Sequence, residues 1–295
     1  MRHLNLKLIT PLVATFILAS GTGYCQTATY PNKPIRLILP FAAGGGADNN
    51  ARTMTELLSQ RLGQPIIIDY KPGAGGTLGA NIVAHAPPDG YTLLYATPGQ
   101  QMTTPHLMDK MPYDPIKSFT PVAFVGRYIY VFVANPTLPI KNAAELLTYA
   151  RNNPGKLNFG SHSGVTQLMF SRISKQQDLQ MNLIPYKGEA PNVNDLLGGH
   201  VQFTLVSTIS TMQHINDGKL TPIAVMLNKR LSLLPKVPTF AEAGLPSLGA
   251  ESWAALFGPA KLPPEIATRM SVAVSAAIAD HESRARIERQ GFDLA

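Results

Sequence analysis

The chain has 295 residues, with 25 Lys and Arg against 18 Asp and Glu, which gives a net charge of +7. The basic residues are scattered and not interleaved with aromatic side chains, which argues against nucleic-acid binding and fits either attraction of anionic solutes or ordinary solubility. The single cysteine, Cys25, excludes an internal disulfide and a thiolate metal site.

The N-terminus has the pattern of a secretory signal. Arg2 and Lys7 precede the apolar run 8–18, and small residues follow at 19–21. The run is shorter than the roughly 20 apolar residues that a membrane-spanning helix needs. We therefore expect a cleaved signal peptide over about residues 1–28. The alternatives are a buried N-terminal helix and a lipoprotein signal at Cys25, for which Tyr24 is a bulky neighbour.

The remaining length, about 270 residues, exceeds what one hydrophobic core usually fills, so we expect two lobes. Short β-rich runs alternate with helical periods, which predicts an α/β fold of parallel sheets flanked by helices. In the first half we expect strands at 35–39, 66–68 and 91–95, a helix with Ala51, Met54, Leu57, Leu58 and Leu62 on one face that ends at Gly63, and a helix with Leu78, Ile82 and Val83.

The second half repeats this alternation. We expect strands at 129–133, 157–160, 201–205, 221–227 and, as the last strand, 253–257, with helices at 143–151, 166–174 and 192–197. A final helix is expected from Pro263, with Ile266, Met270, Val274 and Ile278 as its apolar stripe.

Three strand-to-helix junctions are rich in glycine or serine: 41–46, 73–76 and 161–166. In an open parallel sheet, ligands bind beyond the carboxyl ends of the strands. A helix N-terminus there offers unpaired N–H groups and a positive dipole end, which suit an anion. Three such junctions in one chain predict a shared anion site. Asp48, just after the first junction, is expected to cap its helix.

Common catalytic and nucleotide-binding motifs are absent. The glycines of 73–79 are out of register with the dinucleotide fingerprint, and no GK[ST] follows a glycine loop. Residues 160–164 are similar to the hydrolase elbow, but His162 occupies the position of the nucleophile. An esterase or amidase that uses Ser163 and His162 is the enzyme alternative, against which stands the rarity of nucleophile–base pairs between sequence neighbours. We expect that the protein is not an enzyme and that it binds neither a cofactor nor a metal ion.

At these loops the sequence resembles the tripartite tricarboxylate transporter receptors, also called Bordetella uptake gene (Bug) proteins. The similar stretches run in order from residue 30 to the end: 30–36, Pro40-Phe41 with Gly44-Gly45 and Asp48, 72–76, 88–93, 112–115, 154–161, 185–188, 195–199, 238–239, 242–246 and 258–260.

The resemblance implies a periplasmic-binding-protein-like fold of type II, with two doubly wound α/β lobes joined by crossing strands around a cleft. Lobe 1 would comprise 29–126 plus 251–295, and lobe 2 would comprise 127–250. The implied function is a monomeric periplasmic receptor that captures a small carboxylate and delivers it to a membrane permease. A ligand sensor for a signalling partner is the alternative. The implied contacts are Phe41, Ala42, Ala43, Gly44, Ala74 and Thr97 from lobe 1, and Ser161, Ser163, Thr166, Tyr186 and Asp195 from lobe 2.

Three departures from the resemblance affect the ligand. The loop 161–168 is shorter than the common form, and the usual polar cleft position falls near Val206 and Ser207, which implies a more apolar wall. The chain also stops at Ala295, where relatives usually continue through another strand and helix. Di- and tricarboxylates, amino acids and aromatic acids all stay open. The apolar wall and the lack of a second cationic clamp favour a monocarboxylate or an aromatic acid.

Overall fold

The computed structural model describes residues 30–246, 252–288 and 291–294. The predicted signal peptide and Cys25 lie outside the described residues. No helix within the described part of the chain is long and apolar enough to cross a membrane.

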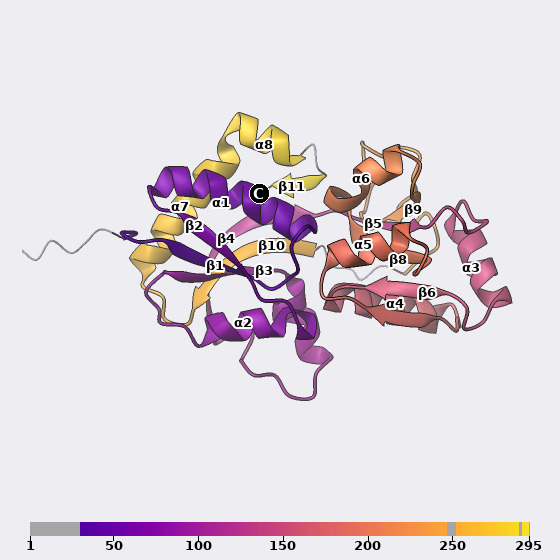
Figure 1. Cartoon of the computed structure of the whole chain (residues 1–295), viewed down its shortest axis with the longest axis horizontal. Helices are drawn as coiled ribbons and strands as arrows, with labels where there is room; N and C mark the ends of the chain where they lie inside the picture. Colours follow the sequence, from indigo (N-terminus) through magenta and orange to yellow (C-terminus); the bar gives the residue numbers. More distant parts are fainter. Residues whose placement is uncertain (1–29, 247–251, 289–290, 295) are drawn as a thin grey trace, which may run out of the picture.

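The strands form two separate sheets, which lie side by side in Figure 1. The first has the order β11-β4-β10-β3-β1-β2 and comprises β1 (Ile35–Leu39), β2 (Ile66–Tyr70), β3 (Thr92–Ala96), β4 (Phe119–Tyr128), β10 (Ser252–Pro259) and β11 (Phe292–Leu294). The second has the order β7-β6-β8-β5-β9 and comprises β5 (Tyr130–Ala134), β6 (Asn158–Ser161), β7 (Asn182–Pro185), β8 (Phe203–Ser207) and β9 (Thr221–Val225). We call the parts around these sheets lobe 1 and lobe 2.

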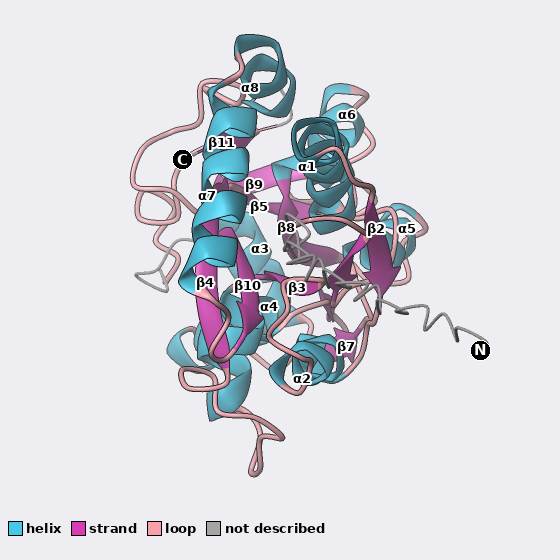
Figure 2. Ribbon diagram, turned by 90° about the vertical axis from the view of Figure 1, so that its left-hand side faces the viewer, coloured by secondary structure: helices cyan, strands magenta, loops and turns pink. Residues whose placement is uncertain are grey.

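Helices cover both sheets. They are α1 (Gly46–Leu62), α2 (Thr77–Ala84), α3 (Ala143–Asn152), α4 (Gly164–Gln176), α5 (Glu189–Leu197), α6 (Thr208–Asn216), α7 (Pro264–Ala279) and α8 (His281–Glu288). Short helical turns lie at η1 (Ala74–Gly76), η2 (Gly99–Thr103) and η3 (Thr104–His106). Figure 2 shows α7 running along one face of the first sheet, and α2 packs against the opposite face.

Strand β1 is an almost continuous apolar run because both of its faces are buried. Leu37 and Leu39 join the core cluster that contains Met54 of α1 and Met270 of α7. Ile38, which points to the opposite face, packs in another cluster with Ala80 of α2. A strand that is covered on both faces must be apolar at successive positions. This double coverage makes 35–39 readable from the sequence, and the strand occupies the predicted residues.

The predicted α/β fold with parallel strands is present, and each sheet also contains antiparallel strands. β1 pairs in parallel with β2 and β3, and β6 pairs in parallel with β7 and β8. The strands β10 and β11 are antiparallel to their neighbours in the first sheet, and β5 is antiparallel to β8 and β9. The parallel part of each sheet carries the glycine- and serine-rich junctions, which follow β1, β2 and β6. The chain passes from the first sheet to the second between β4 and β5, two strands with antiparallel partners.

The prediction missed several elements. β4 escaped because Pro121 and Gly126 interrupt its alternation, and its long antiparallel pairing with β10 joins residues more than a hundred positions apart. The edge strand β7 has only four residues, begins with Asn182 and ends with Pro185, and is partly exposed, so it lacks a clear strand pattern. The strand near Trp253 is not the last one, since α7 leads into α8 and then β11, which pairs with β4.

Candidate ligand-binding site

An inner cavity lies between the two lobes. It has about 20 Å³ of free volume, which is room for about one water molecule. The wall is formed by loops, strands and first helical turns of both lobes. It consists of Phe41, Ala42, Gly45, Ala47, Thr97, Tyr128, Tyr130, His162, Ser163, Val165, Glu189 and Ser252.

A larger outer cavity of about 370 Å³ shares His162 and Ser163 with the inner one. Its wall also contains Ala74, Gly75, Thr104, Leu107, Met108, Ser161, Gly164, Gln167, Pro185 and Tyr186. Neither wall includes a Lys or Arg among the described residues. An anion in these cavities would therefore depend on N–H groups, hydroxyls and helix dipoles.

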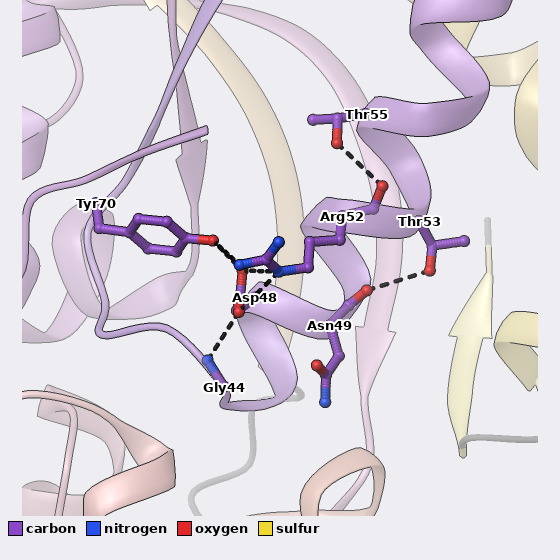
Figure 3. A network of polar contacts seen from close by, with 7 residues as sticks. All are labelled: Gly44, Asp48, Asn49, Arg52, Thr53, Thr55 and Tyr70. Atoms are coloured by element: carbon purple, nitrogen blue, oxygen red, sulfur yellow. Dashed lines mark hydrogen bonds and ion pairs between the residues drawn. The ribbon is translucent and has the colours of Figure 1, made fainter. Parts of the chain in front are cut away.

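The first junction is held in place by a buried carboxylate (Figure 3). Asp48 is 2% exposed and accepts from Gly44 N at 2.7 Å, from the Tyr70 hydroxyl at 2.7 Å and from Arg52 Nε at 3.0 Å. Burial and the neighbouring Asp48 charge raise the pKa of Tyr70 to about 12. The prediction that Asp48 caps α1 was wrong in detail. The N-cap is Gly45, and Asp48 binds back to the loop from the first helical turn.

The predicted contacts on this loop divide into two pairs. Phe41 and Ala42 line the inner cavity, whereas Ala43 and Gly44 are exposed and line neither cavity. Gly44 has a φ of +88°, a left-handed conformation that favours glycine.

The second junction is tied to the inner cavity through Gln100, which the sequence analysis did not single out. Thr97 donates through both its N–H and its hydroxyl to Gln100 Oε1, each at 3.0 Å. Gln100 Nε2 in turn donates to the Gly75 carbonyl at 3.4 Å. The predicted residues Thr97 and Ala74 are thereby placed on the inner and outer cavity, respectively.

The third junction is organised by a fully buried threonine. Ser163 caps α4 and forms a capping box with Thr166. The Thr166 hydroxyl also accepts from His162 N at 3.1 Å and contacts the Ser161 hydroxyl at 2.9 Å. Ser161 and Ser163 line cavities, whereas Thr166 is 0% exposed, lines neither cavity and supports the loop from behind.

Tyr186 and Asp195 act as a pair. The Tyr186 hydroxyl donates to Asp195 Oδ2 at 2.7 Å, and burial together with this carboxylate raises the pKa of Tyr186. Tyr186 lines the outer cavity, whereas Asp195 lines neither. Asp195 therefore orients a wall residue and is not part of the wall.

The structure adds an aromatic and a charged group that the sequence analysis missed. Tyr130 stacks on His162, with ring centroids 6.4 Å apart and an angle of 22° between the planes. Burial lowers the pKa of His162, and the negative charge of Glu189 opposes that shift. Burial and the Glu189 charge raise the pKa of Tyr130. Glu189 directly follows the motif Tyr186-Lys187-Gly188, which was the available signal for its position.

The expectation that Val206 forms an apolar wall of the cleft was wrong. Val206 is 0% exposed and packs in the core of lobe 2 with Val131 and Val193. Its neighbour Ser207 points the other way and donates to Glu189 through its N–H and its hydroxyl. The preference for a monocarboxylate can no longer be based on Val206.

The geometry at Ser163 gives no support to a hydrolase. Its hydroxyl lies 3.3 Å from Thr166 N as a helix cap, and His162 Nδ1 lies 3.3 Å from Asn192 Nδ2. No hydrogen bond joins Ser163 to the His162 ring in the part of the chain that the structure describes. Within the same residues, no group of three His, Cys, Asp or Glu side chains is placed to hold a metal ion.

Two hydrogen bonds cross between the lobes beside the inner cavity. Ala42 N donates to the Lys187 carbonyl at 3.3 Å, and Gly46 N donates to Glu189 Oε2 at 2.9 Å. The loop before α1 thus meets the loop before α5 directly. The inner cavity is therefore enclosed by groups from both lobes.

Comparisons with known proteins agree with this architecture. Residues 50–295 match the family described as the tripartite tricarboxylate transporter family receptor. BugT of Bordetella pertussis is 32% identical over 289 residues, which cover 97% of this chain and 88% of BugT.

Two solved structures are similar over 90% of this chain. Rpa4515 of R. palustris with adipate has a TM-score of 0.86, 32% identity and 89% coverage of its own chain. MatC of Rhodopseudomonas palustris with bound malate has a TM-score of 0.86, 31% identity and 91% coverage. The chain described here belongs to the tripartite tricarboxylate transporter receptor family of periplasmic solute-binding proteins.

Proposed function

We propose that this protein captures a small carboxylate between its two lobes and delivers it to a membrane transporter of the tripartite tricarboxylate type. The observation that carries the proposal is the pair of cavities that share His162 and Ser163. The outer cavity, about 370 Å³, has room for a small carboxylate, and the walls of both cavities come from both lobes. Helix N-termini at the loops before α1 and α4 favour an anion. The adipate and malate in the related R. palustris structures are carboxylates as well.

Seven residues are the proposed ligand contacts. Four of them face the inner cavity: Phe41, Ala42, Thr97 and Ser163. The other three face only the outer cavity: Ala74, Ser161 and Tyr186. Because the contacts are divided between the lobes, only the closed arrangement completes the site, and binding is coupled to closure. We also propose the division into 29–126 plus 251–295 and 127–250, with export to the periplasm after removal of about residues 1–28.

A thermal-shift screen of the mature protein tests ligand capture. The panel would contain mono-, di- and tricarboxylates, amino acids, sugars and nucleotides. A ligand at 100 times its dissociation constant should add about 2.7 kcal/mol to the free energy of unfolding. We expect stabilisation by carboxylates only. Stabilisation by a sugar or a nucleotide, with none by any carboxylate, would refute the proposal.

Delivery to a transporter needs a separate test in cells. Deletion of the gene should abolish uptake of the radiolabelled carboxylate found in the screen, and a plasmid copy should restore it. If uptake is unchanged while a carboxylate-induced gene response is lost, the receptor serves a signalling partner.

A further inference from the structure

The inner cavity contains an acidic side chain in an unusual setting. Glu189 is the first residue of α5 and only 7% exposed. It is the one Asp or Glu among the described residues that line the inner or the outer cavity. A buried carboxylate normally requires a cation or several hydrogen-bond donors.

Glu189 is held entirely by uncharged donors. Its Oε1 accepts from Ser207 N, and its Oε2 accepts from Gly46 N at 2.9 Å and from the hydroxyls of Ser207 and Ser210 at 3.0 Å each. These four donors match the roughly four acceptor positions of a carboxylate. Its negative charge is thus satisfied without Lys or Arg.

The donors come from the N-termini of two helices, and Glu189 itself begins a third. Gly46 is the first residue of α1, Ser207 is the N-cap of α6, and Ser210 lies in the first turn of α6. Helix N-termini stabilise negative charge through their free N–H groups and their dipoles. The arrangement is an anion site between the lobes that the protein fills with its own carboxylate.

We propose that Glu189 is a specificity-determining residue that restricts the cleft to ligands with a single carboxylate. This inference rests on the proposed carboxylate-receptor function. The anion site at the N-termini of α1 and α6 is occupied by Glu189, so a second ligand carboxylate finds no donors there. It would also meet a like charge in a nearly closed cavity that has no cation in its wall, where repulsion is weakly screened.

Removal of the Glu189 side chain should reverse this selectivity. In Glu189→Ala, the N–H groups of Gly46 and Ser207 and the hydroxyls of Ser207 and Ser210 would lose their acceptor. The space of the side chain would join the inner cavity. A dicarboxylate could then place its second carboxylate where the glutamate carboxylate lies.

The test is calorimetric titration with ligand pairs that differ only in one carboxylate: hexanoate with adipate, and butanoate with succinate. We expect the wild type to bind the monocarboxylate of each pair at least tenfold more tightly. In Glu189→Ala that ratio should shift toward the dicarboxylate by at least tenfold. The matched control is Glu265→Ala, an exposed first-turn glutamate of α7 outside the cleft, and it should leave the ratio unchanged.

Glu189→Gln separates charge from volume and also covers the case in which the alanine variant does not fold. It keeps the shape and removes the charge, so we expect a shift in the same direction but smaller. Equal binding of both members of each pair by the wild type, or a ratio that neither variant moves by more than twofold, would overturn the inference and leave the receptor function intact. If no protein in the set binds any carboxylate, it is the proposed function that fails.

Discussion

The N–H group of Gly46 donates to Glu189 Oε2 at 2.9 Å across 143 positions of sequence. The two residues begin α1 in lobe 1 and α5 in lobe 2. An added Cβ at Gly46 would collide with the Ser207 hydroxyl and lie 2.9 Å from that same Oε2. The two lobes therefore meet at a glycine because a larger residue would hold them apart.

Gly46→Ala should weaken ligand binding without unfolding the protein. The new methyl group would collide with atoms of the other lobe, and a small opening of the lobes would relieve that contact. We expect about ten- to hundredfold weaker binding of the best carboxylate and a larger radius of gyration by small-angle X-ray scattering. Gly198→Ala, at a helix end with ordinary φ, is the control. Unchanged affinity and radius would contradict the close approach of the lobes.

Asp48→Asn should destabilise lobe 1 and the loop that precedes α1. The carboxylate of Asp48 serves Gly44 N, Tyr70 and Arg52 at once, and an amide cannot accept from all three. We expect a loss of about 1–3 kcal/mol in the free energy of unfolding, measured by urea denaturation, together with weaker ligand binding. Asp217→Asn, an exposed partner of Lys219, should leave the stability unchanged. Equal effects of the two substitutions would argue against the loop anchor.

Ser163→Ala should act through the cap of α4. The loss of an N-cap side chain costs about 1 kcal/mol of stability. The control is Ser174→Ala in the same helix, which removes a buried hydroxyl that has no hydrogen-bond partner and should cost less. Neither the wild type nor the variants should hydrolyse an activated ester such as p-nitrophenyl acetate above background. Ester turnover that disappears in Ser163→Ala would instead support a hydrolase.

His162 should make the protein less stable in mild acid. Burial lowers the pKa of its imidazole in the folded state, so below about pH 6.5 the unfolded chain binds a proton that the folded chain does not. The neutral, buried imidazole of His162 therefore costs no stability above that pH, and the free energy of unfolding falls as the pH drops below it. His162→Gln should flatten the fall, which is at most about 1.4 kcal/mol per pH unit for one proton. Urea denaturation between pH 5 and 8 measures it, and substitution of the exposed His85 should change nothing.

Much of the fold follows from local pattern. Strand β1 and the glycine-ended helix α1 were predicted from apolar periodicity and a C-terminal glycine, and both are present. Residues of all three junctions also line the two cavities. Local pattern is sufficient here because backbone hydrogen bonds in helices and the burial of alternate side chains depend on near neighbours in sequence.

The sequence alone determined the alternation of strands and helices, the glycine- and serine-rich junctions and, through its motifs, the family. Only the tertiary structure decided that Thr166 is buried behind its loop, that Val206 belongs to the core, and that Glu189 meets Ser207 and Gly46. A glutamate after a glycine looks like an exposed helix start when it is read locally. Its role depends on which donors two other helices bring to it, and those contacts form only when the lobes pack.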